Sequence, residues 1–222
     1  MTQGNRLDRR VTWASVGLAV FVLLTALVHA RLLADIDYAA GLAVRPLGSE
    51  LMDAVSGALS IAFSAELSMV YASMIGLLLW RRGFGIWSLA AFAFLAPNAL
   101  EVLAKMLVLQ PSVPPELHRS ISYPFASVEL RGSYPSGHAV RAWFICTFLA
   151  EAIHSSDLGW KWFGGLGLIL LGLAVSFTRI YLGDHWLSDV VGGLALGVST
   201  AVLVAGPLFL RPAVNRDDLI AI

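Results

Sequence analysis

The chain has 222 residues, of which 58% are hydrophobic and only 14% are charged. Soluble domains usually carry about 25% charged residues, so this composition argues against a soluble domain and predicts an integral membrane protein. The formal net charge is zero, which leaves no general basic field to attract nucleic acid. The length favours a single domain over residues 1–222.

Apolar runs long enough to cross a bilayer, which takes about 20 helical residues, recur along the chain. In chain order, they cover residues 11–30, 61–80, 84–109, 137–153, 162–182 and 185–210. We therefore predict an all-α fold, a bundle of six transmembrane helices. The first run could instead be a signal peptide, because Val28-His29-Ala30 resembles a cleavage site. Its apolar stretch is longer than a signal core of about 7–15 residues, which favours a retained helix.

Basic residues beside the apolar runs indicate the direction of the chain through the membrane. Those next to the runs on one side are Arg6, Arg9, Arg10, Arg81, Arg82, Lys161, Arg211 and Arg216. With six spans, this side should be the cytoplasm. A similar number of basic residues falls on the other side, where most of them belong to three polar stretches. We expect a multi-pass protein of a bacterial inner membrane.

Three polar stretches would meet at the same, non-cytoplasmic face if six spans alternate in direction. Residues 101–115 cover the end of the third run and the start of the loop after it. Residues 133–138 open the fourth run, and residues 178–189 join the fifth to the sixth. Ionisable groups at membrane depth are rare and usually functional. The pattern therefore predicts an active site at this face, open to the periplasm or exterior.

The residues of these stretches suit an anion site. Ser136 and Gly137 stand at the expected start of a helix, where free backbone N–H groups bind anions. Lys105 and Arg179 would add positive charge, and an arginine can hold phosphate oxygens with two N–H groups. The pattern therefore favours a phosphate-bearing ligand.

Two histidines add acid and base chemistry to the anion site. His185 and Asp189 are four residues apart, so they share one helix face. The carboxylate can accept the Nδ1–H of the imidazole and leave Nε2 free to attack. His138 is a second imidazole, able to protonate a leaving alkoxide near neutral pH.

Together these residues resemble the type 2 phosphatidic acid phosphatase superfamily, whose signature is K-x6-R-P, then P-S-G-H, then S-R-x5-H-x3-D. Residues 135–138 match the second motif without change. Arg179, His185 and Asp189 match the third motif at the right spacing, with Thr178 in place of the usual serine. The resemblance is close over residues 101–210.

The first motif departs from the family pattern. Lys105 fits its lysine, but its arginine and proline would fall at Ser112 and Val113. A site with one fewer guanidinium would stabilise the transition state less unless another arginine replaces it. The candidates are Arg119, Arg131 and Arg141.

The resemblance implies a phosphatase that acts on a lipid phosphate or lipid diphosphate. His185 would form a phosphohistidine, Asp189 would orient it, and His138 would protonate the leaving oxygen and then activate water. The residues that would hold the phosphoryl oxygens are Lys105, Ser136, Gly137 and Arg179. We expect no metal and no cofactor. The expected partners are the lipid substrate and membrane lipids, without nucleic acid or an obligate protein partner.

The substrate and the acceptor stay open at this point. Polyprenyl diphosphate (such as undecaprenyl diphosphate), phosphatidic acid and phosphatidylglycerol phosphate all fit. One alternative is a phosphotransferase, in which a lipid or sugar hydroxyl replaces water. Another is a non-catalytic lipid-phosphate binder of the same fold. The intact histidines and Asp189 argue against the binder, because a binder needs no nucleophile.

Overall fold

The computed structural model describes residues 3–119, 132–154 and 161–209, and every regular element in these ranges is a helix. The α-helices are α1 (Gln3–His29), α2 (Ala34–Val44), α3 (Glu50–Ala62), α4 (Ala65–Arg81), α5 (Leu95–Leu107), α6 (Gly137–His154), α7 (Lys161–Tyr181) and α8 (Leu187–Phe209). The 3₁₀ segments are η1 (Arg45–Leu47), η2 (Gly85–Phe92) and η3 (Pro115–Leu117). The predicted all-α fold is confirmed for these residues.

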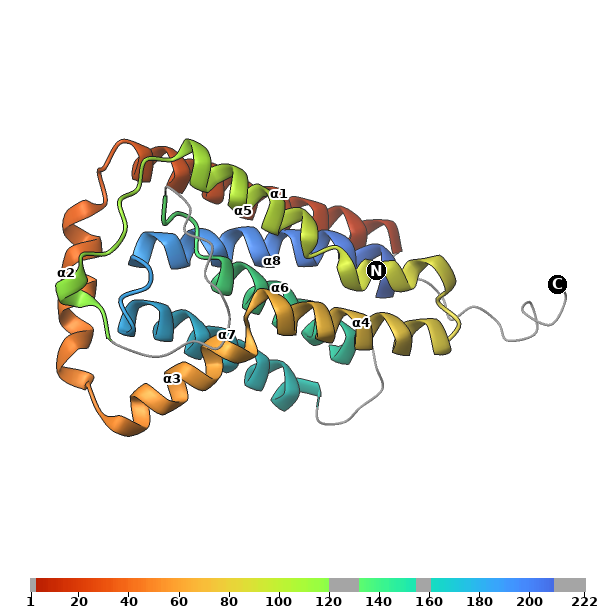
Figure 1. The fold of residues 1–222 in the computed structure, drawn as a ribbon. Coiled ribbons are helices and arrows are strands. Elements are labelled where there is room, and N and C mark those ends of the chain that lie inside the picture. Colours follow the sequence, from red (N-terminus) through yellow and green to blue (C-terminus); the bar gives the residue numbers. More distant parts are fainter. Residues whose placement is uncertain (1–2, 120–131, 155–160, 210–222) are drawn as a thin grey trace, which may run out of the picture.

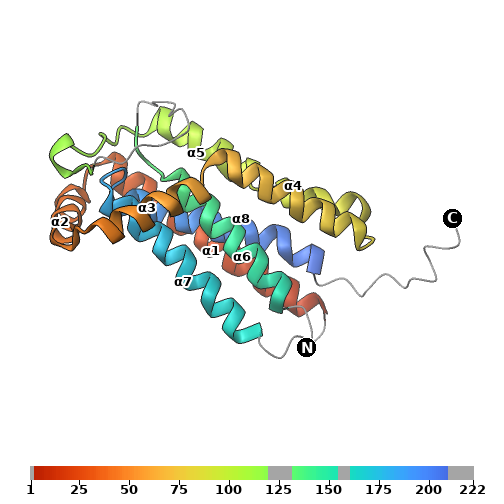
Figure 2. The ribbon, with the colours of Figure 1, turned by 60° about the horizontal axis from the view of Figure 1, so that its bottom comes forward.

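The long helices form an elongated bundle (Figure 1). Successive members α1, α4, α5, α6, α7 and α8 run lengthwise in alternating directions, while α2 lies across one end and α3 runs obliquely from that end to α4. The start of α6 and the turn between α7 and α8 lie at the end that carries α2 (Figures 1 and 2). This arrangement brings the second and third polar stretches to one end of the bundle.

Helices apolar and long enough to cross a membrane account for most of the bundle. Within the described ranges they are Asp8–His29, Ser88–Leu107, Lys161–Tyr181 and Leu187–Ala205, and a fifth span results if α3 and α4 count as one bent helix pair. The buried helix α6 is not among them; it carries Arg141 and Glu151 and packs between other helices. The count of six spans therefore stays a prediction.

The second apolar run was predicted as one helix over residues 61–80, and this is wrong at its start. Helix α3 ends at Ala62, and α4 begins after Ser64, whose hydroxyl accepts the N–H of Leu67 at 3.2 Å. A serine cap of this kind starts a new helix, and the two helices meet at 55°. The break leaves the last carbonyl groups of α3 without helical partners, close to residues of α6.

Close contact between α6 and α8 depends on two glycines of α8. A Cβ on Gly193 would lie 2.7 Å from the carbonyl oxygen of Ser136, and one on Gly197 would lie 2.5 Å from that of Val140. Any side chain at these positions would push the helices apart, as expected for small residues four apart at a helix interface in a membrane. These glycines therefore hold the start of α6 against the first turns of α8.

Candidate active site

His185 and Asp189 form a buried pair where α8 begins. The Nδ1 atom of His185 lies 3.2 Å from Oδ2 of Asp189, whose side chain is 0% exposed. The same oxygen accepts the backbone N–H of Trp186 at 3.0 Å. Because the carboxylate also closes the first turn of α8, it holds the imidazole at a fixed place. Nε2 of His185 has no hydrogen bond to any residue that the structure describes.

The start of α6 is tied directly to this pair. The backbone N–H of Ser136 donates to the carbonyl oxygen of Asp189 at 2.9 Å. The Ser136 side chain is fully buried, and its Oγ has no hydrogen-bond partner among the described residues. A buried polar atom without a partner costs about 1–3 kcal/mol, so an orphan of this kind is expected where a ligand supplies the bond.

Arg179, near the end of α7, is 1% exposed. Its Nη1 pairs with Oδ2 of Asp184 at 3.0 Å, and its Nη2 donates to Oγ1 of Thr178 at 3.1 Å and to Oγ of Ser60. The carbonyl of Arg179 accepts the N–H of His185 at 3.2 Å. The backbone thus couples the arginine to the histidine across the α7–α8 turn.

His138 contacts the end of α3, which the sequence analysis did not include in the site. Its Nε2 lies 3.2 Å from the carbonyl oxygen of Ser60. A carbonyl only accepts, so this bond places the proton of the ring on Nε2. Ser60 therefore bridges His138 and Arg179, through its carbonyl and its hydroxyl. No motif marks Ser60, because only the break between α3 and α4 brings it to α6.

Lys105 and Arg141 meet at one carboxylate beside the start of α6. The Nζ atom of Lys105 pairs with Oε1 of Glu101 at 2.8 Å, and Nη1 of Arg141 lies 3.7 Å from Oε2 of the same residue. The Nε of Arg141 also donates to the carbonyl of Phe63 at 3.0 Å, one of the groups freed by the α3–α4 break. Glu101 itself packs against Gly137.

A comparison with family models decides the family. The model of the PAP2 superfamily matches residues 85–209, more than half of the chain. The chain belongs to the PAP2 superfamily. Together with its apolar helices, this makes it an integral membrane protein.

Individual relatives agree with the PAP2 family. An undecaprenyl-diphosphatase of Sulfolobus acidocaldarius is 35% identical over 34% of this chain and 36% of its own length. A bacitracin transport permease protein of Bacillus licheniformis is 28% identical over 65% of this chain and 68% of its own length. A lipid phosphate phosphatase delta of Arabidopsis thaliana is 26% identical over 79% of this chain. The chain matches about a third of the archaeal relative and 43% of the plant relative.

A solved structure shares the fold. It is a transmembrane PAP2-type phosphatidylglycerolphosphate phosphatase from Bacillus subtilis, 20% identical, which covers 87% of this chain and 94% of its own, with a TM-score of 0.72. At this identity the similarity concerns the fold alone. The helical arrangement described above is therefore that of a PAP2 membrane protein.

The structure separates the candidates for the missing arginine of the first PAP2 motif. The guanidinium of Arg119 is engaged by α3 and α7: its Nε pairs with Oδ1 of Asp53 at 2.8 Å, and it stacks over the Tyr181 ring, 4.7 Å from the centroid. Arg131 lies outside the described residues. Arg141 is the candidate that reaches the start of α6.

Replacing Arg141 with alanine should lower phosphatase kcat/KM by about 10- to 100-fold, because a hydrogen bond to a charged group contributes about 1.5–3 kcal/mol. Replacing Arg119 with alanine should leave kcat/KM within about threefold of the starting protein, a negligible free-energy difference. Kinetics of the two variants with one lipid phosphate, beside their melting temperatures, tests this. A larger loss for Arg119→Ala would assign the role to Arg119 instead.

A second group missed by the sequence analysis anchors the start of α8. The carboxylate of Asp37, in α2, accepts the N–H of Ser188 at 2.8 Å, its hydroxyl at 2.7 Å, and the side-chain amide of Gln110 at 3.2 Å. Burial raises the pKa of the Asp37 carboxyl, and the hydrogen bonds from Ser188 partly oppose that rise. Nothing in the motif spacing predicts this contact, because α2 lies outside the apolar runs.

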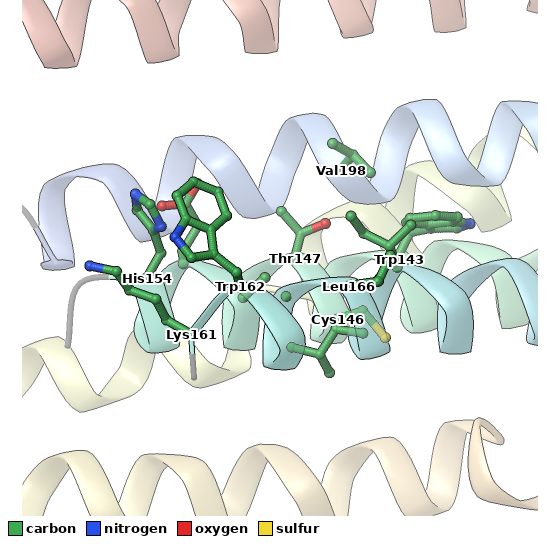
Figure 3. A pocket seen from close by; sticks show the side chains of 13 residues that line it. Trp143, Cys146, Thr147, His154, Lys161, Trp162, Leu166 and Val198 are labelled. Atoms are coloured by element: carbon green, nitrogen blue, oxygen red, sulfur yellow. The ribbon is translucent and has the colours of Figure 1, made fainter. Parts of the chain in front are cut away.

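A cavity of about 490 Å³ lies near the opposite end of α6 and α7 (Figure 3). Its lining is mostly apolar and includes Trp143, Cys146, Trp162 and Leu166, with Glu151 and Lys161 toward the helix ends. None of its lining residues belongs to the three polar stretches. The cavity is therefore separate from the residues of the candidate active site.

Proposed function

We propose that the chain is a phosphatase that removes phosphate from a lipid phosphate or lipid diphosphate, with His185 as the nucleophile. The observation that carries the proposal is the buried His185–Asp189 pair, whose contact through Nδ1 leaves Nε2 of the imidazole for the attack. Backbone hydrogen bonds join this pair to Arg179 and to Ser136 at the start of α6. The printed names of the relatives, undecaprenyl-diphosphatase and lipid phosphate phosphatase, support the same substrate class.

The proposed reaction has two steps. In the first, Nε2 of His185 attacks phosphorus and the bond from phosphorus to the leaving oxygen of the lipid breaks. His138, which enters this step as an imidazolium, gives that oxygen the proton of its Nδ1, because its Nε2–H is bonded to the carbonyl of Ser60. In the second, water attacks the phosphohistidine, His138 takes a proton from the water, and inorganic phosphate leaves as the phosphorus–nitrogen bond breaks. Asp189 stabilises the positive charge on the His185 ring in both steps.

Charge stabilisation is the main requirement of phosphoryl transfer. Arg179 brings a buried guanidinium, whose bonds to Asp184 and Thr178 keep it in one orientation. Lys105 and Arg141 would add two cations at the start of α6, where the Gly137 backbone and the unpartnered hydroxyl of Ser136 would bind phosphoryl oxygens.

We also propose an orientation of the chain in its membrane. Six spans would put the α2 end of the bundle on the non-cytoplasmic side of a bacterial inner membrane, and residues 1–222 would form one domain. The arginine pair Arg81 and Arg82 at the far end of α4 supports this direction. A lipid headgroup at the membrane surface would then reach the histidines while its tail stays in the bilayer.

The test is phosphate release by the full chain, purified in detergent. Undecaprenyl diphosphate, phosphatidic acid and phosphatidylglycerol phosphate are each supplied, with and without a lipid hydroxyl acceptor. We expect free phosphate from at least one lipid, in amounts independent of the acceptor. Phosphate that appears only on the acceptor would indicate a phosphotransferase. Folded protein that binds a lipid phosphate but releases and transfers none would indicate the binder.

A further inference from the structure

The carboxylate of Glu101 occupies the place where α6 begins. Glu101 is only 6% exposed, although it lies in an apolar helix. A Cβ built on Gly137 would overlap its carboxylate carbon and both of its oxygens. Gly137 is the first residue of α6, so the carboxylate lies against a helix N-terminus. An anion is stabilised there by free N–H groups and the helix dipole.

Two cations converge on the same carboxylate. Lys105 pairs with Oε1 at 2.8 Å and Arg141 lies 3.7 Å from Oε2, and both side chains are at most 14% exposed. The hydroxyl of the neighbouring Ser136 is buried without a partner among the described residues. The carboxylate therefore shares its donors with the position proposed above for phosphoryl oxygens.

We propose that Glu101 is an internal competitor of the phosphoryl group. Because a carboxylate and a phosphate cannot use the same donors at once and repel each other at short range, a bound phosphoryl group displaces Glu101 from Lys105 and the start of α6. The carboxylate returns when phosphate leaves, which weakens binding of the inorganic phosphate product. This inference rests on the proposed function, since it concerns the same site.

Glu101→Gln tests the competition, because it keeps the shape of the side chain and removes its charge. Inorganic phosphate is the probe, and two readouts are measured on the full chain in detergent. One is the rise in melting temperature with phosphate concentration, and the other is the inhibition constant of phosphate against lipid hydrolysis. We expect the affinity for phosphate to increase about tenfold, which corresponds to about 1.4 kcal/mol.

Glu151→Gln is the matched control. Glu151 also pairs with a cation, since its Oε2 lies 2.7 Å from Nη2 of Arg10, but this pair lies at the opposite end of α6. Its removal should leave phosphate affinity unchanged. A glutamine variant at Glu101 that binds phosphate as weakly as, or more weakly than, the starting protein overturns the proposal. Weaker binding would mean that Glu101 positions Lys105 and Arg141 for the substrate.

If Glu101→Gln does not fold, Glu101→Asp is used instead. Aspartate keeps the charge, but its side chain is one methylene shorter and reaches the donors less well. Tighter phosphate binding is again expected, with a smaller gain, and weaker or equal binding again overturns the proposal. The melting-temperature readout needs no turnover. A starting protein that hydrolyses no lipid therefore contradicts the proposed function alone, and the comparison of phosphate affinity still decides the role of Glu101.

Discussion

Alanine in place of His185 should lower kcat/KM for lipid phosphate hydrolysis by about 10⁴-fold or more, as loss of a covalent nucleophile does in other enzymes. The imidazole is held by Asp189 at 3.2 Å and its Nε2 is the atom proposed to bond to phosphorus. The remaining groups would still bind the substrate, so the effect should fall on kcat rather than on KM. Rates are measured in detergent with a single lipid phosphate.

His118→Ala is the matched control for this prediction. His118 also lies at the α2 end of the bundle, but its Nε2 lies 2.9 Å from the carbonyl of Val113 within its own loop. This variant should keep activity within about threefold of the starting protein, a difference well below 1 kcal/mol. A folded His185→Ala protein that retains a tenth of the activity would exclude His185 as the nucleophile.

Trapping the intermediate gives an independent measure of the same role. Alkaline, denaturing quenching of a reaction with lipid labelled in its phosphate should leave no label on His185→Ala protein. The starting protein should carry a label that is lost in acid and kept in base, as expected of a phosphorus–nitrogen bond. A label that behaves as a phosphate ester would assign the attack to a hydroxyl group instead.

Arg179→Lys should lower kcat/KM by about 10³-fold, the lower bound of the contribution of an arginine to phosphoryl transfer. A lysine keeps the charge but lacks the planar fork that can bind two oxygens at once. At this position the fork also contacts Asp184, Thr178 and Ser60. One ammonium group cannot make all of these hydrogen bonds and also bind a phosphoryl group.

Arg10→Lys controls for the loss of a guanidinium in general. Arg10 pairs with Glu151 at 2.7 Å at the opposite end of the bundle, so activity and melting temperature should both stay near those of the starting protein. The same two quantities are measured for Arg179→Lys. An Arg179→Lys protein with activity within tenfold of the starting protein would show that positive charge alone suffices at this position.

Local spacing explains why the contact between His185 and Asp189 was predictable. His185 and Asp189 are four residues apart, and the helix brings such residues together wherever the rest of the chain lies. The P-S-G-H stretch was predicted to open a helix, and α6 does begin at Gly137. The apolar runs predicted the helical class for the same reason, because a backbone in a bilayer must satisfy its own hydrogen bonds.

The missing arginine shows where spacing stops being informative. Arg119, Arg131 and Arg141 were equal candidates by distance along the chain. Arg141 reaches the start of α6 because it stands one turn into that helix and donates to the carbonyl of Phe63. Arg119 forms a salt bridge with Asp53 on α3 instead. The position of each arginine depends on carbonyl and carboxylate groups of segments that are distant in the sequence. Local sequence patterns therefore do not predict it.

The sequence by itself determined the helical class, the family resemblance and the histidine–aspartate pair, because these depend on composition and on contacts within one helical turn. Only the tertiary structure decided the contacts that Ser60, Asp37 and Glu101 make with residues of α6, α7 and α8. Ser60 reaches His138 and Arg179 because α3 ends at a break, and Asp37 reaches Ser188 because α2 folds across the end of the bundle. Such contacts join residues more than 70 positions apart, so they exist only once the helices have packed.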